Sequence, residues 1–222
     1  MLRPRKRISK REIKEDALVT AYFRVQKFIQ RHTKQLNIGV TVVIIVIIAG
    51  VFIFRSKKKA ELVAAGKLGI AEQFYYAAEY TKAIEDLTQI VNTYSGTKSA
   101  GTAAFLLANS YFQTGDYNNA QKYYEIYIDD YSDNELFSPS SLAGIAACLE
   151  SNGQYGEAAR LYEKAGKKYP DSFGAPMYLK DAGKCYVLAG DKNKGKEIYH
   201  YIIERYPQSS IRQEVSFLSE YL

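Results

Sequence analysis

The residues best suited to chemistry in this chain are two cysteines and two histidines, and their spacing favours no reaction. Two cysteines are too few for a disulfide framework or a four-cysteine metal site. Cys148 and Cys185 occupy equivalent positions in two neighbouring repeats, which stacked helices would hold roughly 10 Å apart, beyond the ~7 Å limit for a bridge. We therefore predict two separate buried thiols. His200 is a single histidine on a predicted helix, which is more often structural than catalytic, and His32 lies in a basic tail, so neither indicates a catalytic base.

Two glycine-lysine stretches resemble phosphate loops only in part. The run Gly66-Lys67-Leu68-Gly69 is too short, and Lys184 is followed by Cys185 where a phosphate loop has Ser or Thr. Adjacent acidic residues at 85–86 and 129–130 fall on predicted helices, where neighbours in sequence diverge instead of converging on a metal. The sequence predicts no enzyme, no cofactor, no metal site and no small-molecule substrate.

Positive charge is concentrated in an N-terminal tail. The formal net charge is +6, yet residues 1–37 contain 11 Lys or Arg against 3 Asp or Glu, whereas residues 60–222 contain 15 against 21. An acidic folded part would repel a phosphate backbone instead of releasing its counterions. We therefore expect no nucleic-acid partner.

An uncharged run rich in Val and Ile covers residues 38–54. Extended to residue 36, it forms a helix of roughly 28 Å, close to the ~30 Å hydrocarbon core of a bilayer. A buried core helix would show a polar face, and a cleaved signal peptide would have a shorter basic region and a small-residue cleavage pattern. We predict an uncleaved transmembrane helix over residues 36–55, then a linker over 56–63.

The basic tail, residues 1–35, is expected on the cytoplasmic side, because Lys and Arg favour that side. Residues 57–59, all Lys, lie beyond the span and argue for the reverse orientation. Apolar residues recur at helical spacing in the tail: Ile13, Ala17, Val25, Phe28 and Ile29. This is typical of an amphipathic helix on an anionic leaflet. A solvated basic arm is the alternative, and residues 1–11 are expected to be disordered.

The elements that follow the span form a repeat. One frame of large, small, aromatic and turn residues fits four times, beginning at Ile70, Leu107, Ile145 and Ala182, at intervals of 37 or 38 residues. Small residues let two antiparallel helices approach closely, and large ones fill the space between them and reach the next copy. A tyrosine ends every copy: Tyr94, Tyr131, Tyr169 and Tyr206. Residues 210–213 have capping-box spacing, which predicts a last helix running to the C-terminus.

This frame resembles the tetratricopeptide repeat. The predicted fold is all-α: one transmembrane helix, then over residues 64–222 a right-handed α-solenoid of four tetratricopeptide-like helix pairs and a C-terminal capping helix. The Tyr-Pro-x-Ser endings at 169–172 and 206–209 resemble repeats of outer-membrane-assembly lipoproteins and the cell-division coordinator. The plan of tail, single helix and solenoid is similar to the ancillary subunit of the Sec translocon. The resemblance implies a bacterial cytoplasmic (inner) membrane protein whose N-terminus is cytoplasmic and whose C-terminal domain is periplasmic.

In this family the first helix of each pair lines a concave face. The positions that would point into such a partner groove are Leu68, Glu72, Tyr75, Tyr76, Phe105, Asn109, Phe112, Gln113, Glu150, Lys180 and Lys184. The first half of this set is mainly aromatic and the second half is polar. Asn109 matches one position of a clamp for peptide carboxylates, but Leu68 stands where that clamp has Lys, so no clamp is expected.

The leading hypothesis is a membrane-anchored scaffold that binds other proteins and assists protein translocation, folding or envelope complex assembly. Its partners would be translocon, chaperone or envelope complex subunits, and lipid would contact residues 36–55 and the basic tail. Two alternatives stay open: an accessory structural subunit of a larger membrane complex, and an import-receptor-like protein with a cytosolic solenoid.

Overall fold

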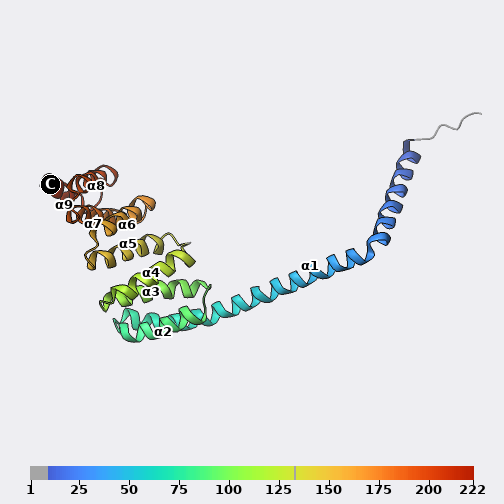
Figure 1. Cartoon of the computed structure of the whole chain (residues 1–222), viewed down its shortest axis with the longest axis horizontal. Coiled ribbons are helices and arrows are strands. Elements are labelled where there is room, and N and C mark those ends of the chain that lie inside the picture. Colours follow the sequence, from blue (N-terminus) through green and yellow to red (C-terminus); the bar gives the residue numbers. More distant parts are fainter. Residues whose placement is uncertain (1–9, 133) are drawn as a thin grey trace, which may run out of the picture. The chain divides into compact units, whose positions relative to one another are not determined.

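The computed structural model describes residues 10–132 and 134–222, with side chains described from residue 19 onward except at 36 and 40. These residues form helices and no strand (Figure 1). The helices are α1 (Lys10–Tyr76), α2 (Tyr80–Thr93), α3 (Lys98–Gln113), α4 (Tyr117–Tyr131), α5 (Phe137–Ser151), α6 (Tyr155–Lys168), α7 (Ala175–Leu188), α8 (Lys192–Arg205) and α9 (Arg212–Glu220). The predicted all-α class is confirmed.

The chain divides into two compact units, Met1–Ser56 and Lys57–Leu222. In the first unit, residues 1–9 of the predicted tail lie outside the described residues, and residues 10–11, expected to be disordered, are helical. α1 bends at His32, whose φ of −116° and ψ of 19° are not helical. Among the described residues one helical segment is long and apolar enough to cross a membrane, and none of its most apolar stretch is buried. Residues 56–63, predicted as a linker, are also helical and belong to α1.

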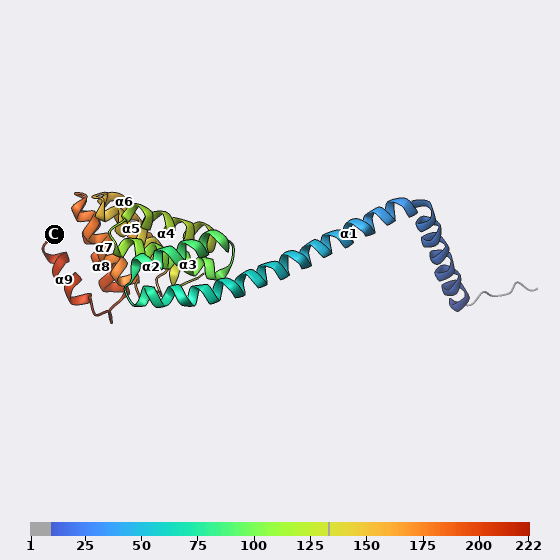
Figure 2. The ribbon, with the colours of Figure 1, turned by 90° about the horizontal axis from the view of Figure 1, so that it is seen from below.

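The second unit is a stack of helix pairs. The C-terminal part of α1 pairs with α2, α3 with α4, α5 with α6, and α7 with α8, and each helix packs against the next along the chain (Figures 1 and 2). One contiguous core runs through the stack from Ala64 to Val215. The predicted helix pairs are therefore present, and the solenoid that they form is confirmed.

A shared turn joins the two helices of every pair. Gly115, Gly153 and Gly190 have φ of 81°, 76° and 91°, in the left-handed region that favours glycine. At each turn the N–H of the next residue donates to a carbonyl five positions back, as from Asp116 to Tyr111 at 2.9 Å, which closes the helix end. Ala78 occupies the same place in the first pair, with φ of 58°. The frame favours glycine at the turn position because the backbone there is left-handed.

Small residues permit close packing where the frame requires them. The ring of Tyr199 lies against Gly183, so close that even a methyl group at Gly183 would collide with it. Ala71, Ala108 and Ala146, at the equivalent position, are fully buried. Ile70, placed by the frame at a position that is buried in the second and third copies, is instead 54% exposed. No earlier repeat covers it, because the first pair is the end of the stack.

The tyrosines that end the repeats connect successive turns. The N–H of Gly96 donates to Tyr131 Oη at 3.0 Å, and Tyr206 Oη donates to the carbonyl of Pro170 at 2.9 Å. The chain ends in α9, which buries Val215 against the last pair and so closes the stack. The predicted capping box is wrong: the residue preceding α9 is Ile211, whose buried side chain fixes the start of the helix by packing, and no side-chain hydrogen bond caps it.

Candidate partner-binding groove

A hollow of about 260 Å³ lies across the middle of the solenoid. Its lining comes from helices α3 to α7 and is mainly aromatic and apolar: Phe112, Tyr124, Ala143, Gly144, Ala147, Tyr162, Met177, Tyr178 and Asp181. The Tyr124 ring packs directly over Gly144, which has no side chain to obstruct it. Of the predicted groove residues, Phe112 lines this hollow.

The aromatic half of the predicted groove is packed to different degrees. Phe105 is half-buried and stacks on Phe137, with ring centroids 4.6 Å apart and an interplanar angle of 15°. It therefore joins two repeats and is poorly available to a partner. Phe112 contacts Tyr117 edge-on at 5.3 Å and keeps one side toward the hollow.

Asn109 connects two tyrosines. Tyr124 Oη donates to Asn109 Oδ1 at 2.5 Å. Burial raises the pKa of Tyr124, so its hydroxyl stays protonated as a donor. Burial also raises the pKa of Tyr75, which a hydrogen bond with Asn109 partly offsets. Asn109 is thus committed to contacts within the solenoid.

The polar half of the predicted groove is paired within the chain. Lys184 Nζ lies 2.6 Å from Glu150 Oε1, and Tyr162 Oη donates to Glu150 Oε2 at 3.2 Å. Burial alone would lower the pKa of Lys184, but the hydrogen bond and the charge of Glu150 raise it above its ordinary value. Lys180 Nζ lies 3.1 Å from Glu214 of α9. These charges stabilise one another across repeats.

Asp181 is a charged residue of this region that the sequence analysis missed. It lines the hollow beside the apolar side chains. Burial raises its pKa, Lys184 opposes the rise, and the carboxylate of Glu150 adds to it. Asp181 directly follows Lys180 in the chain, and its only sequence signal is an acidic residue in the helix that the frame assigns to the groove.

The remaining predicted residues differ in access. Leu68 is buried in the core between α1 and its neighbours, so its side chain does not face a groove, and this placement corrects the expectation. Glu72 is half-buried, whereas Tyr76 and Gln113 are exposed. Leu68 packs inward because α1, the first helix of the stack, turns its apolar side toward α2.

Within residues 10–132 and 134–222, no three His, Cys, Asp or Glu side chains converge in a way that could hold a metal ion. Cys148 and Cys185 are both free and buried, as predicted. Burial, with a smaller effect of Glu125, raises the pKa of the Cys148 thiol to about 12, and burial together with Glu150 raises that of Cys185 to about 12. Neither thiol is suited to act as a nucleophile at neutral pH.

Comparison with known proteins agrees with this geometry. Residues 26–218 match the family described as tetratricopeptide repeat-like domain. No curated protein matches the chain. Among solved structures, the TPR-like repeats of a Podosopora anserina protein align with a TM-score of 0.57 and 16% identity over 71% of this chain and 83% of that one. MamA aligns with a TM-score of 0.57 and 17% identity over 69% of this chain and 81% of that one. YrrB, a TPR protein with an unusual peptide-binding site, aligns with a TM-score of 0.55 and 14% identity over 72% of this chain and 75% of that one. At these identities the likeness establishes the fold.

Proposed function

Because the chain belongs to the tetratricopeptide repeat-like domain family, whose solenoids are interaction scaffolds, we propose that it is a membrane-anchored scaffold that catalyses nothing. The apolar part of α1 crosses the bacterial cytoplasmic membrane, the basic tail stays in the cytoplasm, and the solenoid lies in the periplasm. There it binds proteins during translocation, folding or envelope complex assembly.

The observation that carries this proposal is the exposed apolar segment of α1. Large apolar side chains from Ile38 to Phe54 are exposed, and burying them requires either lipid or protein. The family match begins at residue 26, so it includes this segment together with the solenoid. A segment that lies within the family match is better explained as part of the functional protein than as a leader peptide that is removed.

The anchoring and the orientation are tested in cells that express the full chain. We expect the protein to stay in the membrane fraction after a carbonate wash. We expect protease to remove the solenoid from spheroplasts but not from intact cells. A solenoid protected in spheroplasts would place it in the cytoplasm and support an import-receptor-like protein. Release by carbonate would reject the anchor.

The groove favours a partner segment with apolar side chains. The charged residues in and around it are already engaged: Glu150 with Lys184, Lys180 with Glu214, and Asp181, which lines the hollow, at 4.0 Å from Lys184. A charged peptide would have to separate these pairs and leave a half-buried charge without its partner, which costs free energy. Phe112 and Met177 line the hollow and offer apolar surface without such a cost.

This binding mode is tested by cross-linking in membranes with a matched pair of variants. Phe112→Ala removes apolar surface from the hollow. Leu188→Ala removes an exposed apolar side chain at the far end of α7, outside the hollow. We expect Phe112→Ala to reduce partner recovery strongly, and Leu188→Ala to leave it unchanged, with equal helical circular dichroism in both. Equal recovery by the two variants would reject the groove. Partners that remain in fixed stoichiometry through purification would favour an accessory structural subunit.

A further inference from the structure

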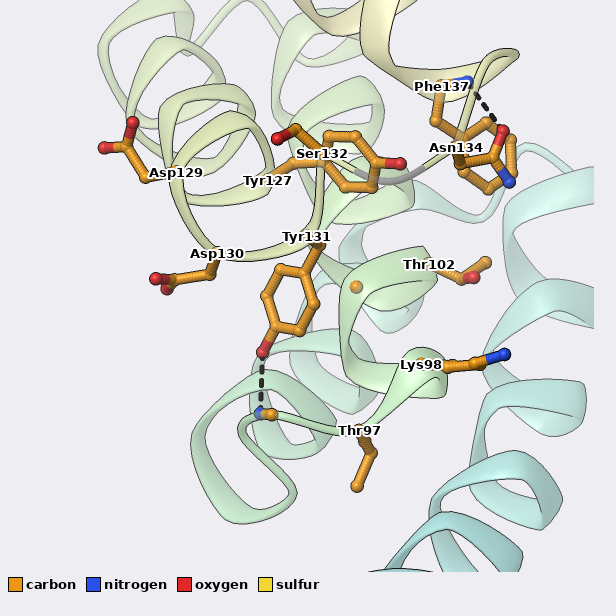
Figure 3. A pocket seen from close by; sticks show the side chains of 12 residues that line it. Thr97, Lys98, Thr102, Tyr127, Asp129, Asp130, Tyr131, Ser132, Asn134 and Phe137 are labelled. Atoms are coloured by element: carbon orange, nitrogen blue, oxygen red, sulfur yellow. Dashed lines mark hydrogen bonds between the residues drawn. The ribbon is translucent and has the colours of Figure 1, made fainter.

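The turns that join one helix pair to the next lie side by side along one end of the solenoid. A hollow of about 810 Å³ lies between the α2–α3 and α4–α5 turns (Figure 3), one of about 370 Å³ between the α4–α5 and α6–α7 turns, and one of about 890 Å³ between the α6–α7 and α8–α9 turns. We call this row, formed by residues 94–97, 134–136, 169–174 and 206–211, the inter-repeat edge. Consecutive turns share a hollow, so the edge is continuous.

Hydrogen bonds join neighbouring repeats at two places along this edge. Figure 3 shows Tyr131 directed at the preceding turn, where its Oη accepts from the N–H of Gly96. Tyr206 makes the corresponding contact to Pro170. These bonds join the α2–α3 turn to the end of α4, and the α6–α7 turn to the α8–α9 turn.

The chain enters the solenoid at this same edge. The carboxylate of Glu61 accepts from the N–H of Ser99 at 3.3 Å and from its hydroxyl at 2.7 Å, and Ser99 follows the first turn of the edge by two residues. Glu61 comes six residues after Arg55, which ends the apolar segment. Six residues reach at most about 20 Å even when fully extended. In a chain that crosses a membrane, this end of the solenoid therefore stays close to the bilayer, whatever the angle between the two units.

Two large apolar side chains project from the edge into solvent. Phe173 is 101% exposed and Leu136 is 64% exposed, and both line the hollow between the α4–α5 and α6–α7 turns. An apolar pair held at the tips of turns is costly in water and is typical of a contact site. The charged neighbours have both signs, with Glu135 and Asp171 beside Lys168. A mixed charge gives little attraction to an anionic or cationic partner, so the apolar pair supplies the binding free energy.

We propose that the inter-repeat edge rests on the bilayer that the apolar helix crosses, with Phe173 and Leu136 inserted at the boundary between lipid headgroups and acyl chains. Aromatic and aliphatic side chains bind there through the apolar area that they bury. This inference rests on the proposed membrane anchoring. It adds a second contact, which would hold the solenoid in one orientation above the membrane.

The chain contains no tryptophan, so single tryptophans report on their surroundings without background. The full chain is reconstituted into phosphatidylcholine vesicles with ordinary or brominated acyl chains, as three variants. Phe173→Trp reports on the edge. Leu188→Trp reports on an apolar position that is 53% exposed at the other end of α7. Phe52→Trp reports on the apolar segment itself.

We expect brominated lipid to quench Phe52→Trp strongly and Phe173→Trp about two-fold, because the boundary region lies within reach of the acyl chains. Leu188→Trp should keep its emission. Quenching of Phe52→Trp without quenching of Phe173→Trp would overturn the edge contact and leave the anchor standing. No quenching at either position would reject the anchor itself. A blue-shifted Phe173→Trp that brominated lipid does not quench would mean that protein covers the edge, and equal quenching of Leu188→Trp would mean that the edge has no special role. Either result overturns the inference.

Discussion

Ala78 is the only one of the four turn residues within helix pairs that is not glycine. Its φ of 58° lies in the left-handed region, as do the φ values of Gly115, Gly153 and Gly190. A residue with a Cβ atom is strained there by about 1–2 kcal/mol. We therefore expect Ala78→Gly to stabilise the solenoid.

The size of the effect follows from two opposing contributions. Glycine relieves the strain of about 1–2 kcal/mol but loses about 0.4–1 kcal/mol through the greater freedom of the unfolded chain. The net gain in the free energy of unfolding is about 0.5–1 kcal/mol. Gly153→Ala is the reverse change. Its φ is 76°, and an added Cβ atom would meet nothing within 4 Å, so its cost of similar size comes from the backbone alone.

Both variants are measured by urea unfolding of the full chain in detergent micelles, followed by far-ultraviolet circular dichroism. Ala78→Gly should raise the midpoint and Gly153→Ala should lower it, with unchanged m-values. The reasoning is refuted if both variants shift the midpoint in the same direction, because one variant removes a Cβ atom from a left-handed turn residue and the other adds one to the equivalent residue.

Three further predictions concern packing and charge. Gly183→Ala should lower the unfolding midpoint, because overpacking against Tyr199 costs about 1–3 kcal/mol, more than the ~1 kcal/mol gained in helix propensity, whereas Gly66→Ala, in open space, should raise it. The two buried thiols should react with iodoacetamide only after unfolding, since pKa values of about 12 lower the thiolate fraction roughly a thousandfold relative to the ordinary 9.0; mass spectrometry of native and unfolded protein tests this. Burial raises the pKa of Asp181, so the folded state holds its proton more tightly than the unfolded chain does. The free energy of unfolding therefore falls as the pH rises above the ordinary pKa of 3.8. Asp181→Asn should therefore stabilise the protein at neutral pH, by an amount that shrinks toward zero as the pH falls.

The helix pairs could be predicted because their requirements are local and repeat. A small residue where two helices approach, and a residue able to turn left-handed eight positions after the frame begins, recur in all four copies. The exposure of Ile70 could not be predicted in this way, because the burial of a residue at the end of a stack depends on what lies beyond it. A linker was predicted at residues 56–63, yet the segment is helical, because its Lys, Ala, Glu and Leu residues are good helix formers and it contains no Gly or Pro.

The candidate groove was less predictable because its availability depends on pairs that are distant in sequence. Lys180 and Glu214 are 34 residues apart, and so are Glu150 and Lys184. The two partners of each ion pair therefore come from neighbouring repeats. The repeat frame assigns a residue to a face of the solenoid, but it does not say which side chains of neighbouring repeats meet there. Phe105 was likewise predicted to face a partner, but it stacks on Phe137, which comes from the next repeat.

The groove and the inter-repeat edge adjoin at Met177 and Tyr178 and otherwise use different parts of the same helix pairs. Ala143 and Ala147 line the hollow from the middle of α5, whereas Leu136 lies just before that helix begins. Contact of the edge with lipid would therefore leave the hollow open to a partner. Phe112 and Phe173 line different hollows, which have Met177 and Tyr178 in common, and substitutions at sites that do not touch each other act nearly additively. Loss of partner binding in Phe112→Ala should then leave the lipid contact of Phe173→Trp unchanged in the double variant, and a coupled loss would mean that the two surfaces are one site.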